Sequence, residues 1–140
     1  MFVVLLTDQL TKFTVVNALS YGQSIPVISG IFHITLVRNS GIAFGLFRNY
    51  PWLLLALITA SLGILFLLAG KVQRQDSLVR YAFALILGGA IGNWVDRMRF
   101  GVVIDFLDFR FWPVFNIADS AITVGVGMYF ISLLKKGRRE

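Results

Sequence analysis

Four long apolar stretches follow one another along this chain, separated by shorter polar connections. A bilayer hydrocarbon core about 30 Å thick needs roughly 20 apolar residues per helix, and each stretch approaches that length. The first stretch is interrupted by Asp8, Gln9 and Lys12, so its apolar pattern is the weakest. The pattern predicts an all-α membrane protein with four transmembrane helices, at about residues 2–19, 52–70, 78–97 and 115–134.

The segment between the first two predicted helices, residues 20–50, has a different pattern. Residues 31–37 are rich in β-branched and aromatic side chains, with Gly30 before them and Gly41 after them. This composition predicts a β-strand bounded by turns. We therefore expect a small extracytoplasmic β-sheet between helices 1 and 2, resting on the bilayer surface.

The connection between the third and fourth predicted helices, residues 97–113, is short and aromatic. Aromatic side chains collect at membrane–water interfaces, so we expect an interfacial loop here. Proline suits the first turn of a helix, and Pro113 therefore marks the expected start of the fourth helix. The aromatic residues of the loop are Phe100, Phe106, Phe109, Phe111 and Trp112.

The composition agrees with a membrane protein. Hydrophobic residues make up 57% of the chain and charged residues 14%, and the mean hydropathy is +0.78. Soluble domains average about 25% charged residues, so most of this surface is not expected to face water. The predicted helices and their connections use up the whole length. We therefore expect a single membrane-embedded domain, residues 1–140, that is monomeric.

The basic residues predict an orientation. The chain has 13 Lys and Arg against seven Asp and Glu, and the connection at 71–80 and the tail at 135–139 hold seven of these basic residues. Dense basic clusters beside apolar spans lie on the cytoplasmic side. Both termini are then cytoplasmic, and residues 20–50 and 97–113 face outward. No basic face is interleaved with exposed aromatic residues, so nucleic acid is not an expected partner.

Several kinds of chemistry are excluded by the residue types present. The chain has no cysteine, which excludes disulfides, thiol catalysis and thiolate metal sites. His33 is the one histidine, so a histidine-rich metal site is excluded and a serine–histidine–aspartate triad would require this residue. We expect no metal and no cofactor. A cleavable signal peptide is not expected either, because no basic residue precedes the short apolar run before Asp8.

The acidic residues within or beside the spans need an explanation, because an Asp at mid-bilayer costs about 2.5–3.5 kcal/mol. Asp8 and Lys12 are four residues apart, which favours a structural ion pair within one helix. Asp96 has Arg97 beside it and Asn93 on the same helical face, which favours an ion pair or a hydrogen-bonded brace. The other acids outside the candidate pair described next are expected at solvated or interfacial positions: Asp76, Asp108 and Glu140.

Asp105 and Asp119 are the candidates for chemistry. Asp119 shares one helical face with Asn116 near the start of the fourth helix, where capping or the helix dipole offers a structural explanation. Asp105 is flanked by apolar residues and has no basic neighbour in the sequence. Two carboxylates brought together share one proton, so one can activate water while the other protonates a peptide carbonyl. The spacing alone does not establish that they meet.

Five segments resemble the lipoprotein signal peptidases, also called signal peptidase II, in the order found in that family. A single motif of this size would be weak, but five in order on four matching spans are specific. The resemblance extends over nearly the whole chain. The segments are DQLTK at 8–12, NSGIAFG at 39–45, GGAIGNWVDR at 88–97, VVIDF at 102–106 and FNIADS at 115–120.

The resemblance implies an aspartic endopeptidase of the bacterial cytoplasmic membrane, with its active site near the outer leaflet. It would remove the signal peptide from a diacylglyceryl-modified prolipoprotein, cutting just before the lipidated cysteine, in contact with membrane lipids. The motif match gives Asp105 and Asp119 the catalytic roles, and Phe44 and Phe47 offer apolar contact to acyl chains. The residues implied to line or support the site are Asn39, Asn93, Arg97 and Asn116, together with Asp8 and Asp96.

Two other classes of protein remain open. Paired carboxylates within a membrane also serve as proton relays, so a small proton-coupled carrier or channel subunit is an alternative. Such a protein would distribute its acids along a path across the bilayer, whereas the best candidates here gather on one side. A non-enzymatic membrane scaffold is the second alternative, but it would not need polar residues on the inner faces of two helices.

Overall fold

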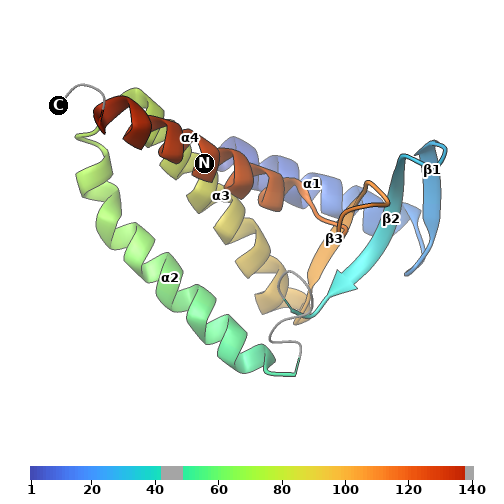
Figure 1. The fold of residues 1–140 in the computed structure, drawn as a ribbon. Helices are drawn as coiled ribbons and strands as arrows, with labels where there is room; N and C mark the ends of the chain where they lie inside the picture. The colour runs from blue at the N-terminus through green and yellow to red at the C-terminus, as the bar shows by residue number, and fades with distance from the viewer. Residues whose placement is uncertain (42–48, 138–140) are drawn as a thin grey trace.

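A computed structural model of the protein describes residues 1–41 and 49–137. In that part of the chain, four helices and three strands follow the order α1, β1, β2, α2, α3, β3, α4 (Figure 1). Their bounds are α1 Phe2–Ala18, β1 Ser24–Ile28, β2 Phe32–Asn39, α2 Pro51–Val72, α3 Ser77–Phe100, β3 Val103–Asp108 and α4 Ile117–Gly137.

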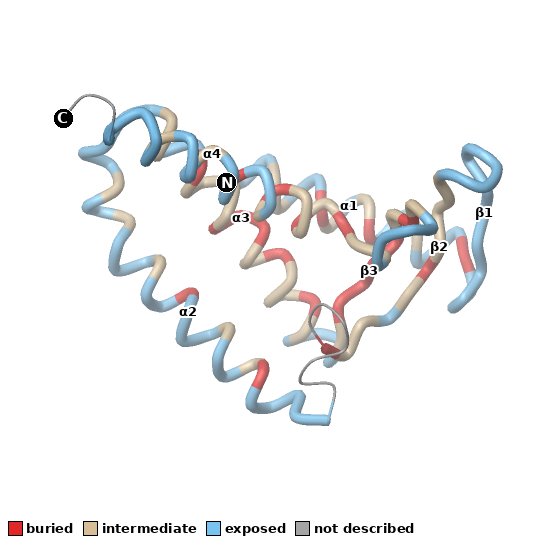
Figure 2. Tube along the Cα trace, viewed as in Figure 1, coloured by how far each residue is buried: buried red, intermediate tan, exposed pale blue. Residues whose placement is uncertain are grey.

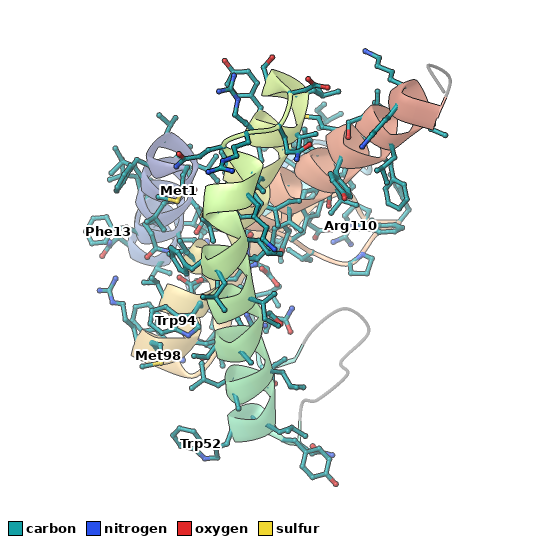
Figure 3. All side chains as sticks on the ribbon, turned by 90° about the vertical axis from the view of Figure 1, so that its left-hand side faces the viewer. Met1, Phe13, Trp52, Trp94, Met98 and Arg110 are labelled. Carbon is teal, nitrogen blue, oxygen red and sulfur yellow. The ribbon has the colours of Figure 1, made fainter. Side chains whose placement is uncertain are left out.

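The helices α1, α3 and α4 lie together, while α2 leans away from them and the sheet lies at the far end (Figure 1). Buried residues gather where α1, α3 and β3 meet, and α2 is exposed along most of its length (Figure 2). Figure 3 shows Phe13 on α1 and Trp52 on α2 pointing outward, and 82% of the Trp52 surface is exposed. Apolar surface of this extent suits contact with lipid rather than water.

Three helices in the described residues, namely α2, α3 and α4, are long and apolar enough to cross a membrane. The prediction of four such spans is therefore confirmed for three. The remaining helix, α1, has 17 residues, and it carries the charged side chains of Asp8 and Lys12. Both of these side chains are buried inside the protein, where they contact polar groups rather than lipid.

The close approach of α3 and α4 depends on glycine, because residues without a large side chain let helix backbones come close together. A Cβ atom added to Gly89 would collide with the backbone carbonyl oxygen of Ala118. A Cβ atom added to Gly125 would lie 2.7 Å from the carbonyl oxygen of Ala82. The two helices thus touch backbone to backbone at two levels, which fixes the position of the start of α4 beside α3.

The sheet is antiparallel, with the strand order β1-β2-β3. The strand predicted at residues 31–37 is confirmed as β2. The prediction that the sheet lies between the first two helices is wrong for its third strand, because β3 comes from the segment expected to be a loop, residues 97–113. That strand pairs with β2 from a distant part of the chain, and Val37 lies opposite Asp105.

Three further predictions for the residues around β3 differ from the structure: the end of the third helix, the start of the fourth helix and the position of Phe106. The helix α3 continues to Phe100 and ends at Gly101, which has a φ of 71° and adopts the left-handed conformation that terminates many helices. Pro113 does not begin the fourth helix, because α4 starts at Ile117. Phe106, expected at the membrane interface, is 4% exposed and belongs to the core.

Candidate active site

A cavity of about 700 Å³ lies between the sheet and the helices α2, α3 and α4. Asp105 and Asp119 both line it, and most of the remaining wall is apolar. The other polar side chains of the wall include three of the residues predicted to line the site, Asn39, Asn93 and Arg97. The fold therefore brings the two candidate acids to one cavity from separate elements, β3 and α4.

Asp105 is held in the middle of β3 and is 1% exposed. Its two carboxylate oxygens accept hydrogen bonds from the amide groups of Asn39, at 2.9 Å, and Asn116, at 2.7 Å. Burial, which disfavours the charged form, raises the pKa of Asp105 to about 6. The hydrogen bond from Asn39 opposes this shift, and the nearby charge of Asp119 adds to it.

Asp119 lies in the first turn of α4, where it forms a reciprocal pair with Asn116. The backbone N–H of Asp119 donates to the Asn116 side-chain oxygen at 2.9 Å, and the backbone N–H of Asn116 faces Asp119 Oδ2 at 3.4 Å. This arrangement is a capping box, which satisfies two of the free N–H groups at a helix start. The structural role considered for Asp119 is therefore present, and it leaves the carboxylate on the cavity wall.

The Asn116 side chain connects the two acids. Its Nδ2 group donates to Asp105 Oδ1 at 2.7 Å and also lies 3.0 Å from Asn93 Oδ1. Asn93 in turn donates from its own Nδ2 to Asp119 Oδ1 at 2.7 Å. Asn116 is fully buried, so this network has little freedom to rearrange. The two acids, which belong to separate elements, are thus hydrogen-bonded to one connected pair of asparagine side chains, Asn116 and Asn93.

A second polar cluster lies beneath the cavity and centres on Lys12, which is 3% exposed. The Lys12 ammonium is 2.8 Å from Asp8 and 2.8 Å from Asp96, so the predicted pair within α1 is confirmed. The structural role predicted for Asp96 is confirmed, but its ion-pair partner is Lys12 and not the neighbouring Arg97. Asp96 on α3 meets Lys12 on α1, a contact that no local sequence pattern reveals.

Asp8 and Asp96 also hold the backbone that carries the candidate acids. Asp8 Oδ1 accepts a hydrogen bond from the Ala118 N–H at the start of α4, at 2.9 Å. Asp96 Oδ2 accepts one from the Ile104 N–H on β3, at 3.1 Å. Sequence reasoning assigned Gln9 no role of its own, yet its amide donates to Asp96 Oδ1 at 2.9 Å. These contacts hold the start of α4 against α1 and the start of β3 against α3.

Arg97 joins α3 to the end of β2. Its Nη2 group donates to the Gly41 carbonyl oxygen at 2.7 Å, and its Nη1 group donates to the Asn93 carbonyl oxygen at 3.3 Å. The guanidinium therefore links the end of α3 to the chain segment that follows β2, at Gly41. Phe44 and Phe47, expected to contact acyl chains, lie outside the described residues.

Asp108, expected at an interfacial position, is 5% exposed. Although burial opposes the shift, hydrogen bonds from Thr35, at 2.7 Å, and from Arg110 lower its pKa. Asp108 lies on β3 like Asp105, but it does not line the cavity. Residues 1–41 and 49–137 contain no group of three acidic or histidine side chains placed to hold a metal ion.

The raised pKa of Asp105 predicts a pH-dependent gain in stability for Asp105→Asn. Above pH 6 the folded protein holds a buried charge, which costs up to about 3 kcal/mol relative to the unfolded chain. As the pH falls through 6 the folded state takes up the proton, and the penalty fades. In detergent, the unfolding temperature of the variant relative to that of the wild type should therefore be higher at pH 8 than at pH 5. The hydrogen bond lost because the new amide nitrogen faces one of the two amide donors lowers it equally at both pH values. A difference independent of pH would contradict the buried-charge explanation.

The fold and the cavity define a helical membrane protein with an acidic site between its helices and a small sheet. A family profile described as Signal peptidase (SPase) II matches residues 1–135. The lipoprotein signal peptidase of Shouchella clausii is 39% identical over 139 residues, covering 99% of this chain and 92% of that protein. The corresponding protein of Moorella thermoacetica is 47% identical over 124 residues, covering 88% of this chain and 82% of its own.

The structure is similar to solved membrane enzymes. A bacterial membrane enzyme determined at 2.3 Å resolution superposes with a TM-score of 0.92 at 32% identity, covering 99% of this chain and 87% of that chain. A second one, at 1.9 Å resolution, superposes with a TM-score of 0.85 at 34% identity, covering 96% of this chain and 89% of that chain. The chain therefore belongs to the signal peptidase II family, and it is a membrane protease.

Proposed function

We propose that this protein is an aspartic endopeptidase that removes the signal peptide from diacylglyceryl-modified bacterial prolipoproteins, cutting just before the lipidated cysteine. Asp105 and Asp119 are the catalytic pair. The observation that carries the proposal is that both carboxylates line one cavity and are linked through the side-chain amides of Asn116 and Asn93. Relatives named lipoprotein signal peptidase support the choice of substrate.

The proposed reaction uses one proton shared by the two acids. One carboxylate takes a proton from water, and the water oxygen bonds to the carbonyl carbon of the scissile peptide. The other acid donates its proton to the carbonyl oxygen, which gives a neutral tetrahedral diol. The diol then collapses: the carbon–nitrogen bond breaks, one hydroxyl proton returns to the pair, and the leaving amine takes up a proton. The amides of Asn39, Asn93 and Asn116 hold the two acids in place during these transfers.

The apolar wall of the cavity suits a substrate that is itself embedded in lipid. Ile58, Leu62 and Leu65 contribute it from α2, and Ile122 contributes from α4. A signal peptide is an apolar helix, and a diacylglyceryl group adds two hydrocarbon chains. Such a substrate reaches the cavity by lateral movement within the membrane, so the enzyme needs no soluble domain. Arg97, on the wall and bonded to Gly41, is placed to contact the polar part of the substrate.

We also propose that α1 crosses the membrane as a fourth span within one domain, residues 1–140, and that the protein acts as a monomer. At about 1.5 Å per residue, its 17 residues approach the thickness of the hydrocarbon core. Its charged residues face α3 and α4, which removes the main obstacle to insertion. The basic connection after α2 and the basic tail support an orientation with both termini in the cytoplasm and the cavity near the outer leaflet of the bacterial cytoplasmic membrane.

The comparisons do not support the proton-coupled carrier or channel considered as an alternative. The position of the acids also argues against it. Asp105 and Asp119 converge on one cavity, whereas a relay needs acidic groups spread across the bilayer.

The proposal is tested with the purified protein in detergent. We expect it to shorten a diacylglyceryl-modified prolipoprotein by the length of the signal peptide, and to leave the same precursor intact when the cysteine is unmodified. Mass spectrometry of the product should place the new N-terminus at the lipidated cysteine. A metal chelator should leave the rate unchanged. Absence of cleavage, or cleavage that requires added zinc, would refute the aspartic mechanism.

A further inference from the structure

The buried ammonium of Lys12 uses its donors on three acceptors. Besides its two carboxylate partners, Asp8 and Asp96, it donates to Asn93 Oδ1 at 3.1 Å. An ammonium has three N–H groups and no lone pair, so it cannot accept a hydrogen bond. Lys12 itself does not line the cavity, and any influence on the reaction has to pass through one of these partners.

The contact with Asn93 determines which end of that amide faces the candidate active site. Asn93 Oδ1 receives N–H donors from both Lys12 and Asn116, at 3.1 and 3.0 Å. The reversed amide would point its own N–H groups at these donors, so that orientation is excluded. The Asn93 Nδ2 group must therefore point the other way, toward Asp119 Oδ1 at 2.7 Å. A hydrogen bond of this kind favours the ionised form of a carboxylate.

We propose that Lys12 is a positioning residue for the peptidase reaction: through Asn93 it holds an N–H donor against Asp119, which keeps Asp119 charged and leaves the shared proton on Asp105. This inference rests on the function proposed above. It gives the two acids separate roles, with Asp119 as the base that activates water and Asp105 as the acid that protonates the carbonyl.

The surroundings of Asp105 agree with this division. Its side chain is 1% exposed, and none of the described cationic side chains forms an ion pair with it. The Asn39 amide that faces it is oriented by the backbone N–H of Gly41, at 3.1 Å, rather than by a cation. Burial raises the pKa of Asp105 to about 6 although the amide donors of Asn39 and Asn116 oppose the shift, and this suits the acid that keeps the proton. The charged groups that act on Asp119 are Lys12 and Asp8 from α1, Arg97 from α3 and Asp105 from β3.

The test compares two neighbouring substitutions on α1, Lys12→Met and Gln9→Met, by measuring kcat/KM against pH with a diacylglyceryl-modified precursor. Without Lys12, only the Asn116 donor still holds the Asn93 amide in its orientation. The amide can then turn its oxygen toward a protonated Asp119, and Asp119 takes up a proton at higher pH. The acid limb of the profile should move upward by roughly one to two pH units, with KM nearly unchanged. Gln9 contacts Asp8 and Asp96 but not Asn93, so Gln9→Met should leave the limb in place.

A double variant separates positioning from simple electrostatics. Lys12→Met leaves two buried carboxylates without their cation, whereas Lys12→Met with Asp8→Asn restores the net charge of the cluster. If Lys12 acts through Asn93, the upward shift persists in the double variant. A return of the limb to its wild-type position would refute the positioning role. The double variant also buries less unpaired charge, so it serves as the test where Lys12→Met alone does not fold.

The remaining outcomes are equally distinct. A profile with an unmoved acid limb and only a lower amplitude in Lys12→Met would show that Lys12 merely stabilises the fold. An equal shift in Gln9→Met would assign the effect to the whole cluster and overturn the inference. Absence of cleavage by the wild-type protein at every pH would refute the proposed function itself, whereas an active wild type with an unshifted variant would refute the positioning role alone.

Discussion

Asp105→Asn and Asp119→Asn are each expected to reduce cleavage of a diacylglyceryl-modified precursor by a factor of about 10² to 10⁴, the range that positioned proton transfer contributes. Asparagine has nearly the same shape as aspartate and retains an oxygen that accepts hydrogen bonds, but it can neither take a proton from water nor donate one from a carboxyl group. The loss of activity is measured as the initial cleavage rate of each purified variant, assayed with about 100-fold more enzyme than the wild type requires.

The matched control for this experiment is Asp108→Asn. Asp108 lies on the same strand as Asp105 and is also buried, but it bonds to Thr35 and Arg110 and does not line the cavity. Its removal should change the rate by no more than a few-fold. Unfolding temperatures of all three variants would show that each is folded. Near wild-type cleavage by either Asp105→Asn or Asp119→Asn would remove that residue from the catalytic pair.

The same contacts that stabilise the fold also position the two acids. Asp119 caps α4 with Asn116, while the N–H of Ala118 in the same turn is bound by Asp8 from α1. Asp96 holds the start of strand β3 by accepting a hydrogen bond from the backbone N–H of Ile104. A folding requirement and a catalytic requirement are therefore met by one network. This explains why the polar residues are concentrated where α1, α3, α4 and the sheet meet, and why the rest of the bundle is apolar.

The helices could be predicted from the sequence because their signal is local. The predicted spans at 52–70, 78–97 and 115–134 agree closely with α2, α3 and α4. The strand β3 could not be predicted in this way, because its stability comes from pairing with β2 and from burial among the helices. Its residues, VIDFLD, are nearly all buried on both faces, so they lack the alternation of a surface strand.

The candidate site could be predicted in its residues but not in its contacts. The motif resemblance named Asp8, Asn93 and Asp96 as site residues, and the cost of charged or amide side chains beside apolar spans agrees with a role for them. Sequence distance, however, hides which of them meet. Lys12 was assigned only to its neighbour Asp8 on α1, and Arg97 was assigned to Asp96. The packing of α1 against α3 instead gives Lys12 a second partner, Asp96, while Arg97 bonds to the Gly41 carbonyl. Such contacts depend on where the helices touch, and the glycines of α3 determine that.

Gly89→Ala is expected to destabilise the protein by about 3 kcal/mol, the upper end of the usual cost of overpacking, because the added methyl group meets backbone rather than a side chain that could move aside. The Cβ atom would collide with the carbonyl oxygen of Ala118 and lie 2.8 Å from Ile122 Cγ1. Relief requires α4 to move away from α3, and this displaces the first turn, where Asp119 is anchored. Cleavage and stability should therefore be lost together.

Gly127→Ala is the matched control, because it makes the same chemical change on α4 with no atom within 4 Å of the new Cβ. It should leave the protein unchanged or stabilise it by up to about 1 kcal/mol, since alanine is the better helix former. Thermal unfolding in detergent and the cleavage rate measure both variants. If Gly89→Ala unfolds and cleaves like Gly127→Ala, then the backbone contact between α3 and α4 does not position the acid on α4. The position of Asp119 would in that case depend on its hydrogen bonds to Asn93 and Asn116 and on the bond from the Ala118 N–H to Asp8.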